Sequence, residues 1–107
     1  MLPEKPYIED TIVACATGAG IGGINVIRVS GIDTEKIAKK LIGDLPGPRI
    51  ATYRKFRNKK NEIIDMGLII FFPSPNSFTG ESVVEFHSHG GPLLREFLID
   101  EIVGLGA

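Results

Sequence analysis

The sequence predicts a single α+β domain in which two strands, a helix, three further strands and a second helix follow one another. Segments rich in β-branched residues alternate with two segments whose apolar residues recur at helical spacing. Clusters of glycine and proline separate these segments and indicate turns. The 107 residues are enough for one domain with one modest hydrophobic core. We therefore expect one main sheet with helices packed on a face.

The predicted elements of the first half are, in order, a loose lead-in at residues 1–10, a buried strand at Thr11–Thr17, a glycine loop at Gly18–Gly23, a strand at Ile24–Ser30, and a helix at Thr34–Ile42 between an Asp33 N-cap and a Gly43 C-cap. Those of the second half are a loop at Asp44–Arg49, an exposed strand at Ile50–Arg57, a polar turn at Asn58–Asn61, a strand at Ile63–Phe72, a strand at Ser82–Ser88, and a helix at Pro92–Val103 stopped by Gly104. The most apolar of them, Ile63–Phe72, is predicted to be the central strand of the sheet. The last helix is predicted from apolar residues at positions 93, 94, 97, 98 and 102.

Composition excludes several classes of protein. Hydrophobic residues make up 43% of the chain and charged residues 23%, and the net charge is −1, so the chain lacks the basic excess of a general nucleic-acid binder. No apolar run approaches the roughly 20 residues of a membrane helix, and the first residues lack the apolar core of a signal peptide. The single Cys15 cannot form an internal disulfide and is interpreted as a buried, inert thiol. These features fit a cytoplasmic protein.

The glycine loop matches a nucleotide-binding pattern without its structural context. Gly18, Gly20 and Gly23 satisfy G-x-G-x-x-G after a predicted strand. A dinucleotide site also needs a helix opening at the loop, and the residues that follow favour a strand instead. We interpret the loop as a hairpin connection that uses the conformational freedom of glycine.

The strand before the Gly90-Gly91 pair gathers polar residues on one face. Alternation places Glu85, His87 and His89 on one side and Val84 and Phe86 on the other. The three polar residues could be metal ligands, although a spacing of two is loose evidence for a metal site. His89 has a simpler interpretation as a turn residue that hydrogen-bonds backbone groups.

Other candidates stay open or have a structural explanation. Glu81 and Glu85 could form an acid–base pair, but Glu81 fits a solvated turn. Arg28, inside an apolar strand, is either an edge residue or a positioned donor for a carboxylate or carbonyl. The basic run at residues 54–60 resembles a short nucleic-acid patch, and its strand–turn context favours a solvated hairpin tip.

Five segments together resemble a known family. They are Asp-Thr-Ile-Val-Ala at 10–14, Gly-Gly-Ile at 22–24, Ile-Arg-Val-Ser-Gly at 27–31, Pro-Asn-Ser-Phe-Thr-Gly-Glu at 75–81 and His-Gly-Gly-Pro at 89–92. In order and register they resemble the N-terminal domain of the tRNA-modification GTPases called MnmE or TrmE. The resemblance covers nearly the whole chain. It implies that residues 1–107 form a folate-binding and dimerisation domain similar to half of the duplicated fold of glycine-cleavage aminomethyltransferases.

The resemblance implies a ligand, partners and site residues. The ligand would be 5-formyltetrahydrofolate as a one-carbon donor, and the partners a second copy of the chain, the flavoprotein MnmG, and a tRNA whose wobble uridine is modified. The folate contacts fall on Arg28 and Glu85, and Phe78 could offer a flat wall to the pterin. Glu85 would accept a paired hydrogen bond from the pterin. Either of two observations would overturn this site: an ion pair that buries Glu85 within its own subunit, or a separation of more than about 15 Å from the Arg28 guanidinium of either subunit.

Departures from the family pattern limit the expected activity. Thr17-Gly18-Ala19-Gly20-Ile21 stands where the family has Thr-Pro-Pro-Gly and a basic residue, and His87 stands where an amide is more usual. The sequence contains no P-loop, so GTP, Mg²⁺ and K⁺ would belong to a GTPase domain that is absent here, as is the helical domain. We expect a fragment without catalytic activity of its own. The rival interpretations are a ligand-free dimerisation domain and a metal-dependent hydrolase using Glu85, His87 and His89.

Overall fold

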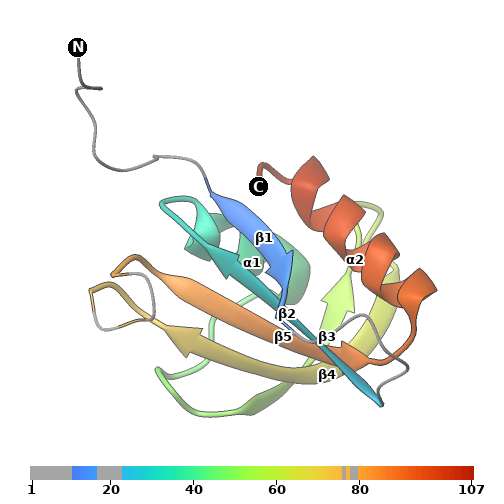
Figure 1. Ribbon diagram of the computed structural model, residues 1–107, viewed down its shortest axis with the longest axis horizontal. Coiled ribbons are helices and arrows are strands. Elements are labelled where there is room, and N and C mark those ends of the chain that lie inside the picture. Colours follow the sequence, from blue (N-terminus) through green and yellow to red (C-terminus); the bar gives the residue numbers. More distant parts are fainter. Residues whose placement is uncertain (1–10, 17–22, 76, 78–79) are drawn as a thin grey trace.

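The elements follow one another in the predicted order. In the computed structural model, which describes residues 11–16, 23–75, 77 and 80–107, five strands and two helices are present (Figure 1). They are β1 (Ile12–Cys15), β2 (Ile24–Ser30), α1 (Thr34–Ile42), β3 (Thr52–Arg57), β4 (Ile63–Phe72), β5 (Val83–His89) and α2 (Pro92–Gly104). The predicted α+β class is confirmed.

The strands form one antiparallel sheet in the order β1-β2-β5-β4-β3. The prediction that β4 is the central strand is wrong, because β5 lies in the middle, between β2 and β4. Burial agrees with this order, since Val83 to Phe86 are all buried in β5 whereas β4 has only Ile69 and Phe71 buried. Hydrophobicity alone misplaced the centre because pairing between distant segments decides strand order.

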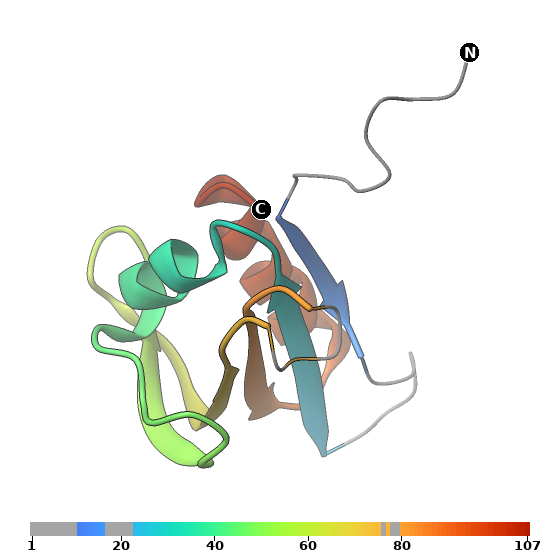
Figure 2. The same cartoon turned by 90° about the vertical axis from the view of Figure 1, so that its left-hand side faces the viewer.

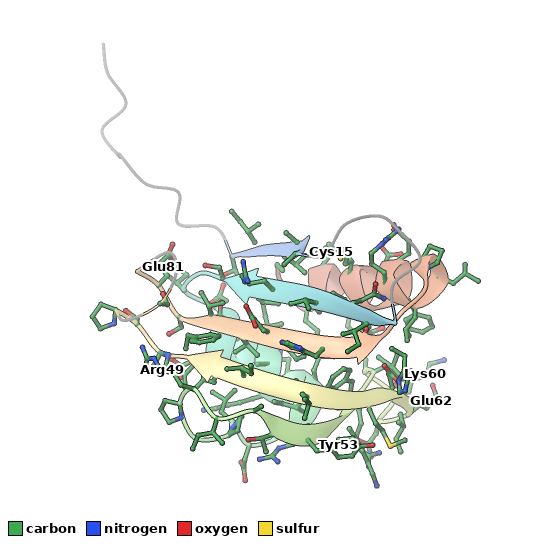
Figure 3. All side chains as sticks on the ribbon, turned by 60° about the horizontal axis from the view of Figure 1, so that its bottom comes forward. Cys15, Arg49, Tyr53, Lys60, Glu62 and Glu81 are labelled. Atoms are coloured by element: carbon green, nitrogen blue, oxygen red, sulfur yellow. The ribbon has the colours of Figure 1, made fainter. Side chains whose placement is uncertain are left out.

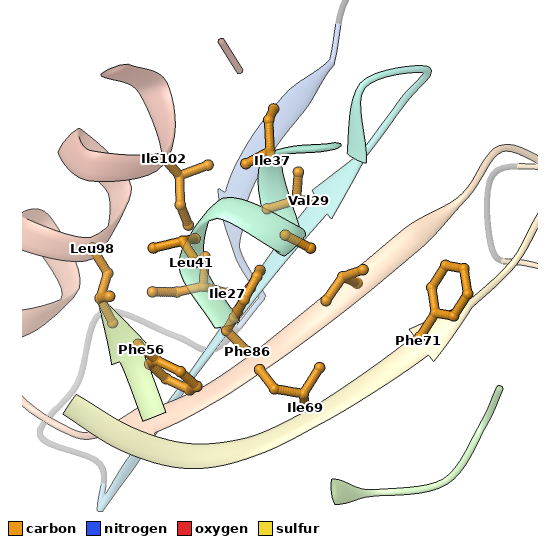
Figure 4. Close-up of a cluster of buried hydrophobic side chains, with 12 residues drawn as sticks. Ile27, Val29, Ile37, Leu41, Phe56, Ile69, Phe71, Phe86, Leu98 and Ile102 are labelled. Atoms are coloured by element: carbon orange, nitrogen blue, oxygen red, sulfur yellow. The ribbon is translucent and has the colours of Figure 1, made fainter. Parts of the chain in front are cut away.

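Both helices lie on the same face of the sheet. Helix α1 packs against β3 and β5, and α2 packs against β1 and β2 (Figure 2). The core fills the space between helices and sheet, and Figure 4 shows Ile27, Ile69 and Phe86 of the sheet beneath Leu41 of α1. Phe56 meets Phe86 edge to face, with ring centroids 5.6 Å apart. The opposite face of the sheet is turned away from the helices (Figure 3).

Strand β1 differs from its prediction as a buried strand. Among the described strands it lies at the edge of the sheet and pairs with β2 alone, and its residues alternate between exposed and half-buried. Ile12 is 54% exposed, and Cys15 is half-buried rather than buried. The loop between β1 and β2 lies outside the described residues except for Ala16 and Gly23, but the strand predicted after it is present. That strand excludes the helix that a dinucleotide site requires.

Helix α1 has the predicted bounds, but its first turn is held by a different contact from the predicted one. Asp33 is the N-cap by position, but its side chain makes no capping hydrogen bond. Its backbone N–H instead donates to Thr11 Oγ1 at 2.9 Å, which ties the helix to the start of β1. Gly43 ends the helix with φ 80°, a conformation that favours glycine.

Helix α2 buries less than its apolar pattern predicts. Leu98 and Ile102 are buried, but Leu93 is 86% exposed and Phe97 51% exposed. Gly104 is the last residue of the helix rather than the residue that stops it. Neither helix in the described part of the chain is long and apolar enough to cross a membrane.

Candidate functional site

Arg28 and Glu85 stand directly opposite each other on the open face of the sheet. The antiparallel register of β2 and β5 pairs them. Alternation turns both side chains away from the core, because their neighbours Ile27, Val84 and Phe86 are buried beneath the helices. The prediction that Glu85 and His87 share a face opposite Val84 and Phe86 is therefore confirmed.

The two charged side chains form an ion pair. Arg28 donates twice to one carboxylate oxygen, Glu85 Oε2, through Nε at 3.0 Å and through Nη2 at 2.6 Å. Glu85 is only 7% exposed, and a carboxylate so well buried needs a charged partner. One of the two conditions set against the folate site is thus met, since Glu85 is in an ion pair within its own subunit. The other is not, because the two residues are in contact. Glu85 is not the free acceptor that the sequence predicted.

His87 contacts the other oxygen of the Glu85 carboxylate. Its Nε2 lies 3.2 Å from Glu85 Oε1, and its side chain is 24% exposed. Both carboxylate oxygens therefore have partners from this chain. The sequence did not predict this contact, because side chains two apart on a strand meet only when a carboxylate turns along the strand.

The His87 ring also borders a hollow of about 240 Å³ on the open face. The hollow is lined by Gly23, Ile24, Tyr53, Met66, Gly67, Leu68, His87, Ser88 and His89. Several of these are large apolar side chains left exposed, among them Tyr53 at 59% and Leu68 at 43%. An apolar hollow next to a charged pair suits a flat ligand with a polar edge.

Asp65 and His89 form a second polar contact that the sequence did not reveal. Asp65 Oδ2 accepts the backbone N–H of His89 at 2.9 Å, and Oδ1 lies 2.7 Å from the ring Nδ1. His89 was predicted to hydrogen-bond backbone groups with its side chain, and the structure places a carboxylate there instead. The only signal for Asp65 was an acidic residue inside an apolar strand.

Asn25 fixes the glycine turn that follows β5. Its amide donates to the carbonyl oxygens of His89 at 3.0 Å and Gly91 at 3.1 Å. The backbone N–H of Gly90 donates to the Gly23 carbonyl at 3.0 Å. The start of α2 is therefore bound to the start of β2. Asn25 is 5% exposed, and the sequence pattern alone does not single it out.

The described residues add no other predicted site residue to this group. Phe78, Gly18 and Gly20 lie outside the described residues. His89 bonds to Asp65 and not to Glu85. Within the described ranges, no three His, Cys, Asp or Glu side chains form a group that could hold a metal ion.

Comparison with known proteins identifies the class. Residues 11–107 match the family model described as "GTP-binding protein TrmE N-terminus". The chain belongs to this family, as its N-terminal domain.

The relatives carry one name. The chain is 47% identical over 99 residues to the tRNA modification GTPase MnmE of Nitrosomonas eutropha. It is 50% identical over 98 residues to that of Coxiella burnetii, and 48% identical over 97 residues to that of Proteus mirabilis. These alignments cover 92%, 92% and 91% of this chain, and 22%, 22% and 21% of the relatives. The chain thus spans about a fifth of the length of the curated relatives it matches.

Proposed function

We propose that this chain is the folate-binding and dimerisation module of a cytoplasmic tRNA-modifying GTPase. The observation that carries the proposal is the family match over residues 11–107. The α+β domain would form half of a folate-binding fold of the aminomethyltransferase kind. The ligand would be 5-formyltetrahydrofolate, the one-carbon donor for wobble-uridine modification. GTP hydrolysis, the MnmG partner and tRNA modification would require the rest of such a protein, and this module would not be catalytic by itself.

The ion pair changes how Glu85 would take part. Arg28 holds Glu85 Oε2 through two hydrogen bonds, and His87 lies at Oε1 with one contact. The ligand would replace His87 at Oε1, because that contact is single and longer. The apolar hollow beside His87 offers room for the flat ring system of a pterin. Arg28 would hold the carboxylate in its orientation, and Phe78 would add a flat wall.

A calorimetric titration with 5-formyltetrahydrofolate, taken to millimolar concentration, tests the proposal. Saturable heat in the unaltered chain and its loss in Glu85→Ala support it. Glu85→Gln should weaken binding by about 1.5–3 kcal/mol, because the amide loses a charge-assisted acceptor. Glu96→Gln, which neutralises an exposed carboxylate on α2, is the matched control and should bind as the unaltered chain does. Equal affinity in Glu85→Gln and the control contradicts a role for Glu85.

A second copy of the chain would cover the open face of the sheet. Exposed apolar side chains gather there, away from both helices: Ile12, Ile24, Tyr53, Met66 and Leu68. The burial of such an apolar surface commonly stabilises a homodimer. Leu68→Asp should therefore shift sedimentation equilibrium toward monomer. Leu93→Asp, at an exposed position on the helix side of the sheet, should not.

The structure also favours a second candidate, a dimerisation domain that binds no ligand. In that case the contacts of Glu85 with Arg28 and His87 serve the fold alone, since both carboxylate oxygens already have partners. Intact dimers that give no heat with the folate would establish this candidate over the first.

A further inference from the structure

A second hollow lies on the helix side of the sheet and is cationic. It measures about 390 Å³ and is lined by Lys40, Arg57, Asn58, Lys59, Asn61 and Leu105. Lys40 is in the last turn of α1, and Leu105 caps the C-terminal end of α2. Arg57 is the last residue of β3, and Asn58, Lys59 and Asn61 lie in the turn between β3 and β4. None of these residues belongs to the Arg28–Glu85–His87 group. We call this feature the cationic hollow.

Hydrogen bonds within the turn fix its shape. Asn58 Oδ1 accepts the backbone N–H groups of Lys60 and Glu62, each at 2.9 Å. Arg57 Nη1 donates to the Asn61 carbonyl at 3.1 Å, and Asn61 has φ 64°. The backbone that carries these basic residues therefore has a fixed conformation. A ligand would not have to order the turn when it binds.

The cations of the hollow are not tied up in salt bridges within the described residues. In the part of the chain that the structure describes, Lys40, Arg57 and Lys59 form no salt bridge. One acidic group is near, since Glu62 Oε1 accepts the Asn58 amide at 2.9 Å. The local charge thus differs in sign from the chain's net charge of −1.

The negative C-terminal ends of the two helices offset only part of this positive charge. Lys59 Nζ lies against the last turn of α2, 3.4 Å from where a Cβ would stand on Gly104, and Lys40 lies in the last turn of α1. Each helix C-terminus carries about half a negative charge, so the two together offset about one of the three cations. Glu62 offsets about one more. About one positive charge is left without an offset, and it favours an anion in the hollow.

We propose that the cationic hollow binds phosphate groups of an RNA backbone. Its volume of about 390 Å³ and its two exposed lysines suit a chain of phosphates more than one buried ion, and the Arg57 guanidinium matches phosphate geometry. This inference rests on the proposed function, which supplies an RNA as the partner of the full protein. It also reverses the interpretation of residues 54–60 as only a solvated hairpin tip. The contact would be independent of base sequence and would orient the RNA.

Fluorescence anisotropy with a labelled, unmodified tRNA transcript tests the inference at several salt concentrations. The double variant Lys40→Ala/Lys59→Ala should weaken binding about tenfold at low salt. It should also reduce the slope of log K against log salt by about 0.7–0.9 for each phosphate that the variant no longer neutralises. The control Lys39→Ala/Lys55→Ala removes the same charge from two exposed lysines outside the hollow and should stay within about twofold of the unaltered chain.

Three results would overturn the inference. They are no tRNA binding by the unaltered chain at low salt, equal weakening in both double variants, and displacement of the tRNA by millimolar inorganic phosphate at constant ionic strength. The last would make the hollow a site for small anions. All four lysines are exposed, so circular dichroism should show an unchanged fold. The folate titration separates the two proposals, because Lys40→Ala/Lys59→Ala should keep the folate heat of the unaltered chain.

Discussion

Asp65 holds His89 at two points, accepting its backbone N–H at 2.9 Å and contacting its ring Nδ1 at 2.7 Å. The Asp65 side chain is 10% exposed and the His89 side chain 72% exposed. The Asp65 carboxylate of β4 thus binds the last residue of β5, just before the glycine turn. Because an ionised carboxylate only accepts hydrogen bonds, Nδ1 of the His89 ring is the donor in this contact.

Asp65→Asn should destabilise the fold by about 1–2 kcal/mol, because an amide keeps one acceptor oxygen where the carboxylate has two. The measurement is the free energy of unfolding in urea. Asp100→Asn, which neutralises an exposed carboxylate on α2, should leave that free energy unchanged. Equal midpoints for the two variants would show that the two contacts add nothing to stability.

Arg28→Met should destabilise the fold by about 2 kcal/mol, because it leaves the Glu85 carboxylate with His87 as its only remaining partner among the contacts described above. The loss stays below the roughly 3–5 kcal/mol of fully buried pairs because the Arg28 side chain is 35% exposed. Adding Glu85→Gln should recover part of the loss, since the buried charge is then removed. A double-mutant cycle in urea measures the coupling, and strictly additive losses would contradict the ion pair as a stabilising contact.

Gly67→Ala should destabilise the fold by about 3 kcal/mol or more, because a Cβ there would lie 1.9 Å from the carbonyl oxygen of His87. The obstacle is backbone of the neighbouring strand, so β4 and β5 would have to separate. Gly23→Ala is the control, since its Cβ would meet no atom of the described residues within 4 Å. A Gly67→Ala protein as stable as the Gly23→Ala protein would show that the two strands are further apart than described.

Leu98→Ala should cost about 2–5 kcal/mol, because Leu98 is 1% exposed and its removal leaves a cavity between α2 and the sheet. Leu93→Ala, on the same helix at 86% exposure, should cost less than about 0.5 kcal/mol. Urea unfolding of the two variants compares them directly. Similar losses would mean that α2 packs through a different side.

Local patterns were sufficient to predict the order of the elements. Strand β2 was predicted from β-branched residues at alternate positions, and α1 from an apolar stripe whose Ile37, Ala38 and Leu41 are buried. The same patterns could not predict that β5 lies in the middle of the sheet or that Leu93 of α2 is exposed. Both depend on which distant segments meet, and no local period contains that information.

The candidate site was predicted in part for the same reason. The face shared by Glu85 and His87 follows from alternation along one strand. The ion pair with Arg28 depends on the register between β2 and β5, and a shift of one residue would have turned Arg28 toward the helices. The Asp65–His89 contact depends on how β4 passes β5 near Gly67. The cationic hollow needs α1, α2 and a turn together, so the basic run alone gave only a weak signal.

The position of β5 has a consequence for how the chain acquires its structure during synthesis. Strands β1 and β2 pair with each other, as do β3 and β4, and each pair joins segments close in sequence. The two pairs meet only through β5, the last strand to leave the ribosome. Until Val83–His89 emerges, the earlier strands can pair only as two separate hairpins with open inner edges, so this interval is when the nascent chain most needs protection from aggregation.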